Sequence, residues 1–306
     1  MSTAAGADGP QSGTAHAASM PAMLYGTAWK KEHTADLVYE AIKAGFRGID
    51  TAHMKRHYDE AGAGEGIRRA IRDGLVTRSD LWIQTKYSPF DEPYASDPST
   101  PTITSQILAS VSASIANLSP DPSDPSVFQL DALILHSPFP EPTDTLEAWT
   151  ALCTLTPHPI RTLGISNVTL PTLRLLSTAP HPPLIVQNRI RRAERAFDID
   201  VRRWVASHSS SGMRYQGFWT LTGNRDEWQQ SEFVGRLASA AVVERATAWY
   251  ALLLASDVVV LNGTTSQEHM HGDLEGLEKV KRWRETEAGK ELWDGCLREF
   301  VAMIGK

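Results

Sequence analysis

The sequence has few cysteines, the residues that form disulfide bonds and zinc knuckles. Its two cysteines, Cys153 and Cys296, form no CxxC or CxxxC cluster. A disulfide framework and a zinc knuckle are therefore excluded, and a reducing compartment is the natural setting. Long apolar runs are also lacking, since no window offers the ~18 uninterrupted apolar residues that a membrane span requires.

Basic residues are not in excess either. The chain has 30 Lys and Arg against 36 Asp and Glu, a net charge of −6, so neither nucleic acid nor an anionic membrane is an expected partner. The first twenty residues are rich in Ala, Gly, Ser and Thr, and they lack the basic start and apolar core of a secretory signal. We predict a disordered tail at residues 1–20 and a cytoplasmic protein.

From residue 24 onward, short apolar runs typical of strands alternate with longer segments of helical period. The expected strands are Leu24–Thr27, Phe46–Asp50, Leu81–Lys86, Ala132–His136, Thr162–Ser166, Leu184–Gln187, Arg214–Phe218 and Val258–Leu261. Eight such alternations predict an α/β protein, a single-domain (β/α)8 TIM barrel over residues 21–306. An open doubly wound sheet is the alternative, but it favours a GxGxxG turn after its first strand, and residues 24–29 have none.

Polar residues close the second to sixth expected strands. In a TIM barrel the active site lies at the carboxyl ends of the strands, so these residues would face one mouth. They are Asp50, Lys86, His136, Ser166 with Asn167, and Gln187. One charged residue at a strand end marks only where the chain meets water, whereas a consecutive set favours a functional site.

Several segments resemble, in order, the motifs of the aldo-keto reductase family. They are Gly45–Ala52, His57–Ile67, Thr85–Lys86, Leu135–Pro138, Gly164–Asn167 and Val186–Asn188. Tyr215–Trp219 and Leu261–Thr265 are most similar to a fungal-type subgroup. The resemblance implies an NAD(P)H-dependent oxidoreductase that reduces the carbonyl of a small aldehyde or ketone by direct hydride transfer. Its catalytic residues would be Asp50, Tyr58, Lys86 and His136.

The chemistry of these four residues is coherent in itself. Hydride transfer to a carbonyl leaves an alkoxide that must receive a proton. A free tyrosine has a pKa near 10, and we expect the Lys86 ammonium, held by Asp50, to lower the pKa of Tyr58. His136 would donate a hydrogen bond to the carbonyl oxygen. Tyr58 is thus the predicted proton donor.

The spacing between Asp50 and Tyr58 departs from the family pattern. It is three residues longer than usual, and we place the extra residues in a loop, where insertions are tolerated. Tyr87 is the competing candidate, but as the strand neighbour of Lys86 it should point to the opposite face.

The resemblance also implies the cofactor site. Ser166, Asn167 and Gln187 would bind the nicotinamide carboxamide, and Tyr215 would stack on the ring. Four further residues would line the pyrophosphate and adenosine end, namely Thr220, Leu221, Thr264 and His269.

The adenosine end lacks the cations that the family commonly uses. Gly263 and His269 stand where a lysine and an arginine usually grip the 2′-phosphate of NADPH. Losing two cations at a dianionic group should weaken NADPH binding. NADP(H) is the expected cofactor, with NAD(H) possible.

Two alternatives remain at this point. His53 and His57 have i, i+4 spacing, but there is no HExxH and no third ligand, so no metal is expected. The altered spacing and the missing cations would also suit a non-redox protein of the same fold, an isomerase, a cyclase or a binding and regulatory module. The complete set of four catalytic residues favours the reductase.

Overall fold

The computed structural model describes residues 19–89 and 102–305. Residues 1–18, most of the predicted tail, lie outside these ranges. Eight strands are present: β1 Met23–Gly26, β2 Gly48–Asp50, β3 Trp82–Tyr87, β4 Ala132–Leu135, β5 Leu163–Ser166, β6 Ile185–Arg189, β7 Arg214–Phe218 and β8 Val258–Asn262. Each pairs in parallel with the next and β8 pairs with β1, which closes the barrel. The predicted (β/α)8 architecture is confirmed.

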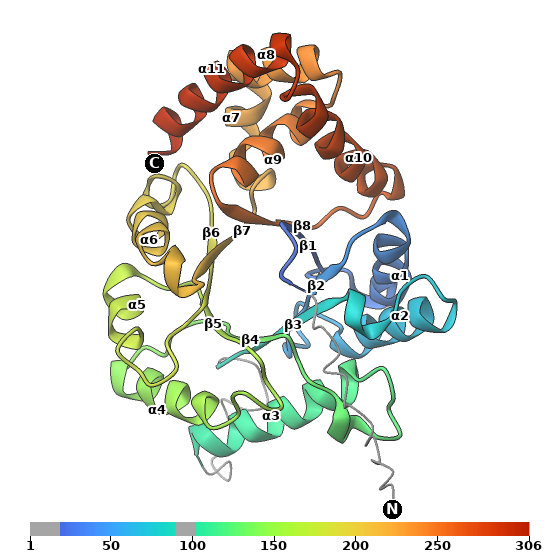
Figure 1. The fold of residues 1–306 in the computed structure, drawn as a ribbon. Helices are drawn as coiled ribbons and strands as arrows, with labels where there is room; N and C mark the ends of the chain where they lie inside the picture. Colours follow the sequence, from blue (N-terminus) through green and yellow to red (C-terminus); the bar gives the residue numbers. More distant parts are fainter. Residues whose placement is uncertain (1–18, 90–101, 306) are drawn as a thin grey trace, which may run out of the picture.

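The helices form a ring around this barrel (Figure 1). They are α1 Thr34–Ala44, α2 Glu60–Arg72, α3 Ile103–Leu118, α4 Pro142–Cys153, α5 Leu170–Leu176, α6 Arg195–Ser207, α7 Arg225–Gln230, α8 Glu232–Ala241, α9 Arg245–Ala255, α10 Gln267–Trp283 and α11 Glu287–Ile304. Helix α11 begins at Glu287 because the side chain of the preceding Thr286 accepts a hydrogen bond from the Gly289 amide, 3.0 Å away. The apolar residues of helical spacing before residue 286 therefore belong to a separate helix, α10.

Side chains along each strand alternate between the barrel interior and the helices. The interior apolar cluster is small and consists of Leu24, Trp82, Ala132, Ile134 and Ile185. The neighbouring positions along the strands, such as Ile83 and Leu133, join the much larger core between barrel and helices. This two-residue period places Lys86 on the interior face and Tyr87 on the outer face. The interior therefore holds polar side chains above its apolar layer.

Long apolar helices are scarce in this ring. Within residues 19–89 and 102–305, no single helix is long and apolar enough to cross a bilayer, and only α8 with α9, across a 103° bend, reaches that length and composition together.

Helix α2 packs very closely on the end of α3. A Cβ at Gly64 would lie 1.9 Å from the backbone oxygen of Asn117. We predict that Gly64→Ala lowers the free energy of unfolding by about 1–3 kcal/mol, because backbone has to move to make room. Urea unfolding monitored by circular dichroism measures this change.

Gly272 in α10 provides the matched control. A Cβ there meets nothing within 4 Å, so Gly272→Ala should be neutral or stabilising by up to about 1 kcal/mol. Equal stability of the two variants would contradict the close approach of α2 and α3.

Candidate active site

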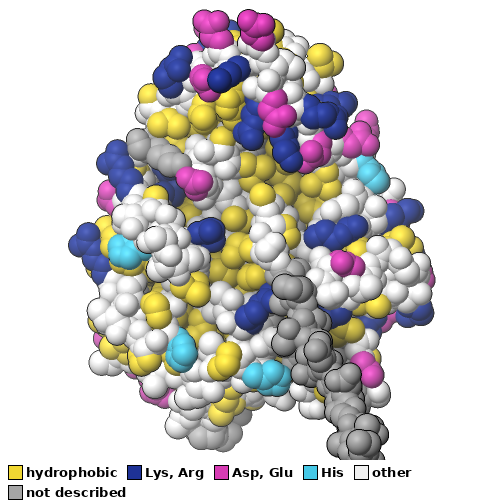
Figure 2. Space-filling view, in the orientation of Figure 1, with side chains coloured by type: hydrophobic (Ala, Val, Ile, Leu, Met, Phe, Trp, Pro, Cys, Tyr) yellow, Lys and Arg dark blue, Asp and Glu magenta, His cyan; other side chains and the backbone are white. Residues whose placement is uncertain are grey.

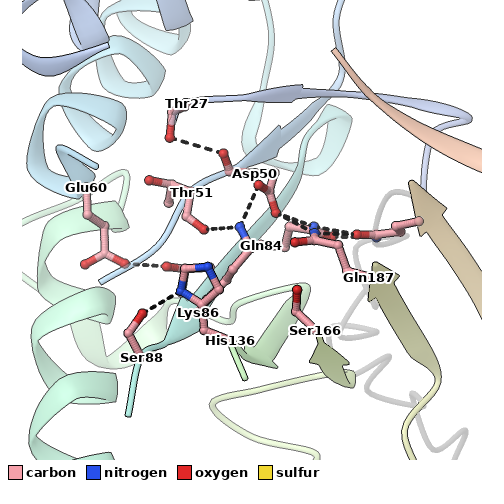
Figure 3. Close-up of polar contacts among 12 residues, drawn as sticks. Thr27, Asp50, Thr51, Glu60, Gln84, Lys86, Ser88, His136, Ser166 and Gln187 are labelled. Atoms are coloured by element: carbon pink, nitrogen blue, oxygen red, sulfur yellow. Dashed lines mark hydrogen bonds and ion pairs between the residues drawn. The ribbon is translucent and has the colours of Figure 1, made fainter. Parts of the chain in front are cut away.

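A buried ion pair lies at the centre of the barrel mouth. Lys86 Nζ lies 2.6 Å from Asp50 Oδ2, and both side chains are almost completely buried. The ammonium also donates to the Thr51 carbonyl over 2.8 Å. Figure 3 shows the two side chains reaching toward each other from β2 and β3. The pair thus presents a fixed cation to whatever lies next to it.

Amide side chains form a layer beneath this pair. Gln84 Nε2 and Gln187 Nε2 donate to Asp50 Oδ1 over 2.6 and 3.0 Å. Both also donate to Gln216 Oε1, over 2.9 and 2.8 Å. Sequence reasoning missed Gln84 and Gln216, although the two-residue period from Lys86 to Gln84 is a signal that could have found the first. The layer satisfies the Asp50 oxygen that does not face Lys86.

Tyr58 reaches the ion pair from the loop before α2. Its ring centroid lies 5.1 Å from Lys86 Nζ and 5.9 Å from the ring centroid of His136. A short turn over residues 55–57 precedes it, and the Tyr58 amide donates to the Met54 carbonyl over 2.9 Å. The turn accommodates the three extra residues, so the lengthened loop still brings Tyr58 to Lys86.

Burial and charge act in opposite directions on Tyr58. Burial raises the pKa of its phenol above the usual value, while the Lys86 ammonium lowers it and the Asp50 carboxylate raises it. The predicted effect of Lys86 on the pKa of Tyr58 is present, but burial outweighs it. The phenol therefore keeps its proton at neutral pH.

His136 lies beside Tyr58 just after β4. Its Nδ1 is 2.6 Å from the Ser88 hydroxyl, which fixes the orientation of the ring. Burial, with the charges of Lys86 and His57 added, lowers the pKa of His136 to about 3. The imidazole is therefore neutral at physiological pH, and a donated hydrogen bond from Ser88 would leave its proton on Nε2.

The predicted carboxamide-binding residues lie on β5 and β6, with Asn167 directly after the end of β5. Asn167 donates from Nδ2 to the His136 carbonyl over 2.9 Å and to Ser166 Oγ over 3.2 Å. Its backbone has a φ of 54°, in the left-handed region that asparagine tolerates. Gln187 belongs to the amide layer under Asp50. The structure thus brings all three close to the four catalytic candidates.

Tyr215 does not lie with this group, and its predicted stacking role is corrected. Its hydroxyl donates to Asp198 Oδ2 over 3.0 Å, and its ring is buried in the core between barrel and helices. The reason is the two-residue period, because Gln216 points into the barrel and its neighbour must point out. By the same period Phe218, at the carboxyl end of β7, shares the interior face.

The remaining predicted cofactor residues lie around the ends of β7 and β8. Carbonyls of Thr220 and Leu221 accept hydrogen bonds from the indoles of Trp249 and Trp228, over 3.0 and 3.1 Å. His269 lies in the first turn of α10, where its amide donates to Ser266 Oγ over 3.2 Å.

Lys30, which contacts the Thr264 carbonyl, is a candidate binding residue that sequence reasoning missed. Lys30, just after β1, is only 5% exposed, and its Nζ donates to the Gly263 carbonyl and, over 3.5 Å, to that of Thr264. Among residues 19–89 and 102–305, no carboxylate lies within 4.0 Å of this ammonium. Burial lowers the pKa of Lys30 to about 8. A buried cation without a counter-ion suits an anionic ligand.

His53 and His57, which have the spacing of metal ligands, do not converge on a metal site. His53 Nδ1 lies 2.9 Å from Glu60 Oε2, and the ring of His57 stacks on Trp29 with centroids 4.0 Å apart. In the part of the chain that the structure describes, no three His, Cys, Asp or Glu residues are grouped to hold a metal ion.

Comparison with known proteins identifies the family of this chain. The sequence model of the Aldo/keto reductase family matches residues 13–216. The chain belongs to the aldo/keto reductase family. The predicted family is thereby confirmed, and the barrel described above is the fold that its members share.

The curated relatives of this aldo/keto reductase match only in part. An NAD(P)H-dependent D-xylose reductase of Pachysolen tannophilus is 51% identical over 67 residues, 22% of this chain and 20% of the relative. The aldo-keto reductase AKR2E4 of Bombyx mori is 31% identical over 159 residues, 49% of this chain and 46% of the relative. The chain thus spans a fifth to about half of the length of these relatives.

Solved structures match over most of the barrel. The aldo-keto reductase AKR2E5 of Bombyx mori has a TM-score of 0.67 and 19% identity, covering 89% of this chain and 83% of that one. The same enzyme complexed with NADPH has a TM-score of 0.66, with the same identity and coverage. At this identity the likeness shows the fold alone.

The low pKa of His136 gives a test of the site geometry. The folded pKa of about 3 lies below the ordinary value of 6.5, so the unfolded chain binds more protons between these values. The stability that neutral His136 contributes is therefore complete above pH 6.5 and is lost as the pH falls toward 3. We predict a neutral imidazole at pH 5, measured by ¹⁵N NMR and assigned with His136→Gln. Titration of this ring near pH 6.5 would contradict its placement.

Proposed function

We propose that this aldo/keto reductase is an NADP(H)-dependent enzyme that reduces an aldehyde or ketone to an alcohol. The observation that carries the proposal is the phenol of Tyr58 beside the buried Lys86–Asp50 pair. His136 completes the group, with its ring facing that of Tyr58 edge to face. A proton donor, a fixed cation and a neutral hydrogen-bond donor therefore surround one point at the mouth of the barrel.

These groups fit the two parts of carbonyl reduction. NADPH, when bound, would provide the hydride that the carbonyl carbon requires. Tyr58 gives its proton to the carbonyl oxygen as charge develops there, and the Lys86 ammonium stabilises the phenolate that remains. The raised pKa of Tyr58 suits this role, because a general acid has to hold its proton until the reaction needs it.

His136 would position the carbonyl oxygen. As a neutral imidazole it can donate from Nε2 without competing with Tyr58 as an acid, because its pKa is lowered to about 3. Ser88 holds the other ring nitrogen at 2.6 Å. The donor is therefore fixed in place before substrate binds.

The residues at the mouth fit a nicotinamide cofactor. The Ser166 hydroxyl and the Asn167 amide offer the donors and acceptors that a carboxamide needs. Phe218, in place of Tyr215, would stack on the ring. The buried Lys30 ammonium at the ends of β1 and β8 would bind a phosphate group of the cofactor.

The adenosine end favours modest discrimination between NADPH and NADH. Thr264 and His269 offer a hydroxyl and an imidazole at the start of α10, where the family commonly has a serine or threonine and an arginine. The curated relatives named above include an NAD(P)H-dependent enzyme. We therefore propose NADP(H) as the cofactor with NAD(H) also accepted.

Replacing the proton donor tests the reaction. Tyr58→Phe should lower kcat by about 10²–10⁴-fold, because the alkoxide then lacks its proton source. NADPH affinity should stay unchanged, since the ring is retained. Turnover is measured by NADPH absorbance with a panel of aldehydes, and Tyr87→Phe is the control. Full activity of Tyr58→Phe would overturn the role of Tyr58.

Replacing the buried cation tests the cofactor. Lys30→Met should raise the dissociation constant for NADPH about tenfold or more, because a charge-assisted contact to phosphate is lost. Wild-type affinity should also fall above pH 8, as Lys30 loses its proton, and the variant should lack this dependence. Fluorescence titration with NADPH and NADH measures both effects.

Lys290→Met on α11 is the control of equal charge for Lys30→Met. Binding of neither nucleotide to the wild-type protein would exclude hydride transfer and leave the non-redox alternative. NADPH binding that Lys30→Met leaves unchanged would contradict the contact between Lys30 and phosphate.

A further inference from the structure

A cavity lies at the end of the barrel opposite the candidate active site, where the strands begin. Its volume is about 670 Å³, the size of a site for a small organic ligand. It is bounded by the end of α6, the loop into β7, the loop between α9 and β8, and the residues before β1. Figure 2 shows this face, with apolar side chains in a hollow and Lys or Arg side chains beside it.

Three arginines line this cavity, namely Arg202, Arg203 and Arg214. Arg202 is 7% exposed, and its guanidinium donates to the Phe197 and Ile304 carbonyls. Arg214 donates to the carbonyls of Met213 and Ser209, over 3.1 and 3.4 Å. In the described ranges, no carboxylate lies within 4.0 Å of any of the three.

The three arginines give the wall of the cavity a positive charge. The net charge of the whole protein is −6, yet the cavity wall carries three guanidinium groups against one carboxylate, that of Asp257. Burial lowers the pKa of Arg202, and the Arg203 charge lowers it further, while Tyr215 and Asp198 raise it. A bound anion would offset the positive charge of this wall.

Most of the rest of the wall is apolar, and three serines, Ser209, Ser210 and Ser256, add hydroxyl groups. Met20, Ala22, Met213, Leu254 and Val259 supply hydrocarbon and thioether surface. Ser256 is 5% exposed, and its hydroxyl has no hydrogen-bond partner among the described residues. A ligand for this wall needs an apolar body as well as a charge.

We propose that this cavity is a binding site for an organic anion, a carboxylate, sulfonate or phosphate ester that carries an apolar group. Arg203 and Arg214, both exposed, hold the charged group, and Arg202 fixes the wall behind it. The site is separate from the mouth and does not depend on the proposed reaction.

The cavity also borders the residues beneath the active site. Met20 lines it, and Gln216 Nε2 donates to the Met20 sulfur over 3.4 Å. Gln216 in turn belongs to the amide layer under Asp50. A ligand in the cavity therefore lies one side chain away from the polar interior of the barrel.

Binding of a fluorescent arylsulfonate tests the site. We expect 8-anilinonaphthalene-1-sulfonate to bind the full-length protein saturably with a stoichiometry near one. The double variant Arg203→Gln/Arg214→Gln should weaken binding about tenfold or more, because both charge-assisted contacts are lost. The uncharged analogue N-phenyl-1-naphthylamine should bind weakly to both proteins.

Two further variants keep this test decisive. Arg72→Gln/Arg174→Gln removes the same charge from exposed positions on α2 and α5 and should leave the affinity unchanged. Ala206→Trp fills the cavity from an exposed position on α6 and should abolish binding while all arginines remain. Absence of saturable binding, or equal affinity in wild type and Arg203→Gln/Arg214→Gln, would overturn the proposal.

Discussion

The buried pair of Lys86 and Asp50 is the interaction on which the rest of the site depends. An ion pair this deep is stable only if the remaining polar atoms are also satisfied, and removing one partner typically costs about 3–5 kcal/mol. Asp50 and the Thr51 carbonyl accept from the Lys86 ammonium, while Gln84 and Gln187 satisfy the second oxygen of Asp50. The pair thereby connects β2, β3 and β6, and its orientation fixes the cation beside Tyr58.

Much of the fold and site could be predicted because the signals are local. The strands are short, mostly apolar runs, and polar residues close the second to sixth of them, so the order of the barrel and the positions of Asp50, Lys86 and His136 follow from the chain itself. Helices α7 and α8 follow less directly from the sequence, because they are short and tertiary contacts position them, α7 against α9 and α8 against α9 and α11.

The misplaced and missed residues have different physical causes. Tyr215 was assigned by motif similarity, although the two-residue period of β7 requires it to face opposite to Gln216. Lys30 carries no sequence signal, since a lysine is ordinarily exposed. Its burial depends on the loop after β8, more than two hundred residues away in the sequence.

Because of the turn at residues 55–57, the position of Tyr58 does not depend on the length of the loop that precedes it. Tyr58 is held by the Met54 carbonyl and by the start of α2, where the neighbouring Asp59 side chain accepts from the Gly62 amide over 2.9 Å. Neither contact depends on the number of residues between the end of β2 and Tyr58. A sequence pattern that demands a fixed interval between aspartate and tyrosine would therefore pass over chains whose catalytic geometry is intact.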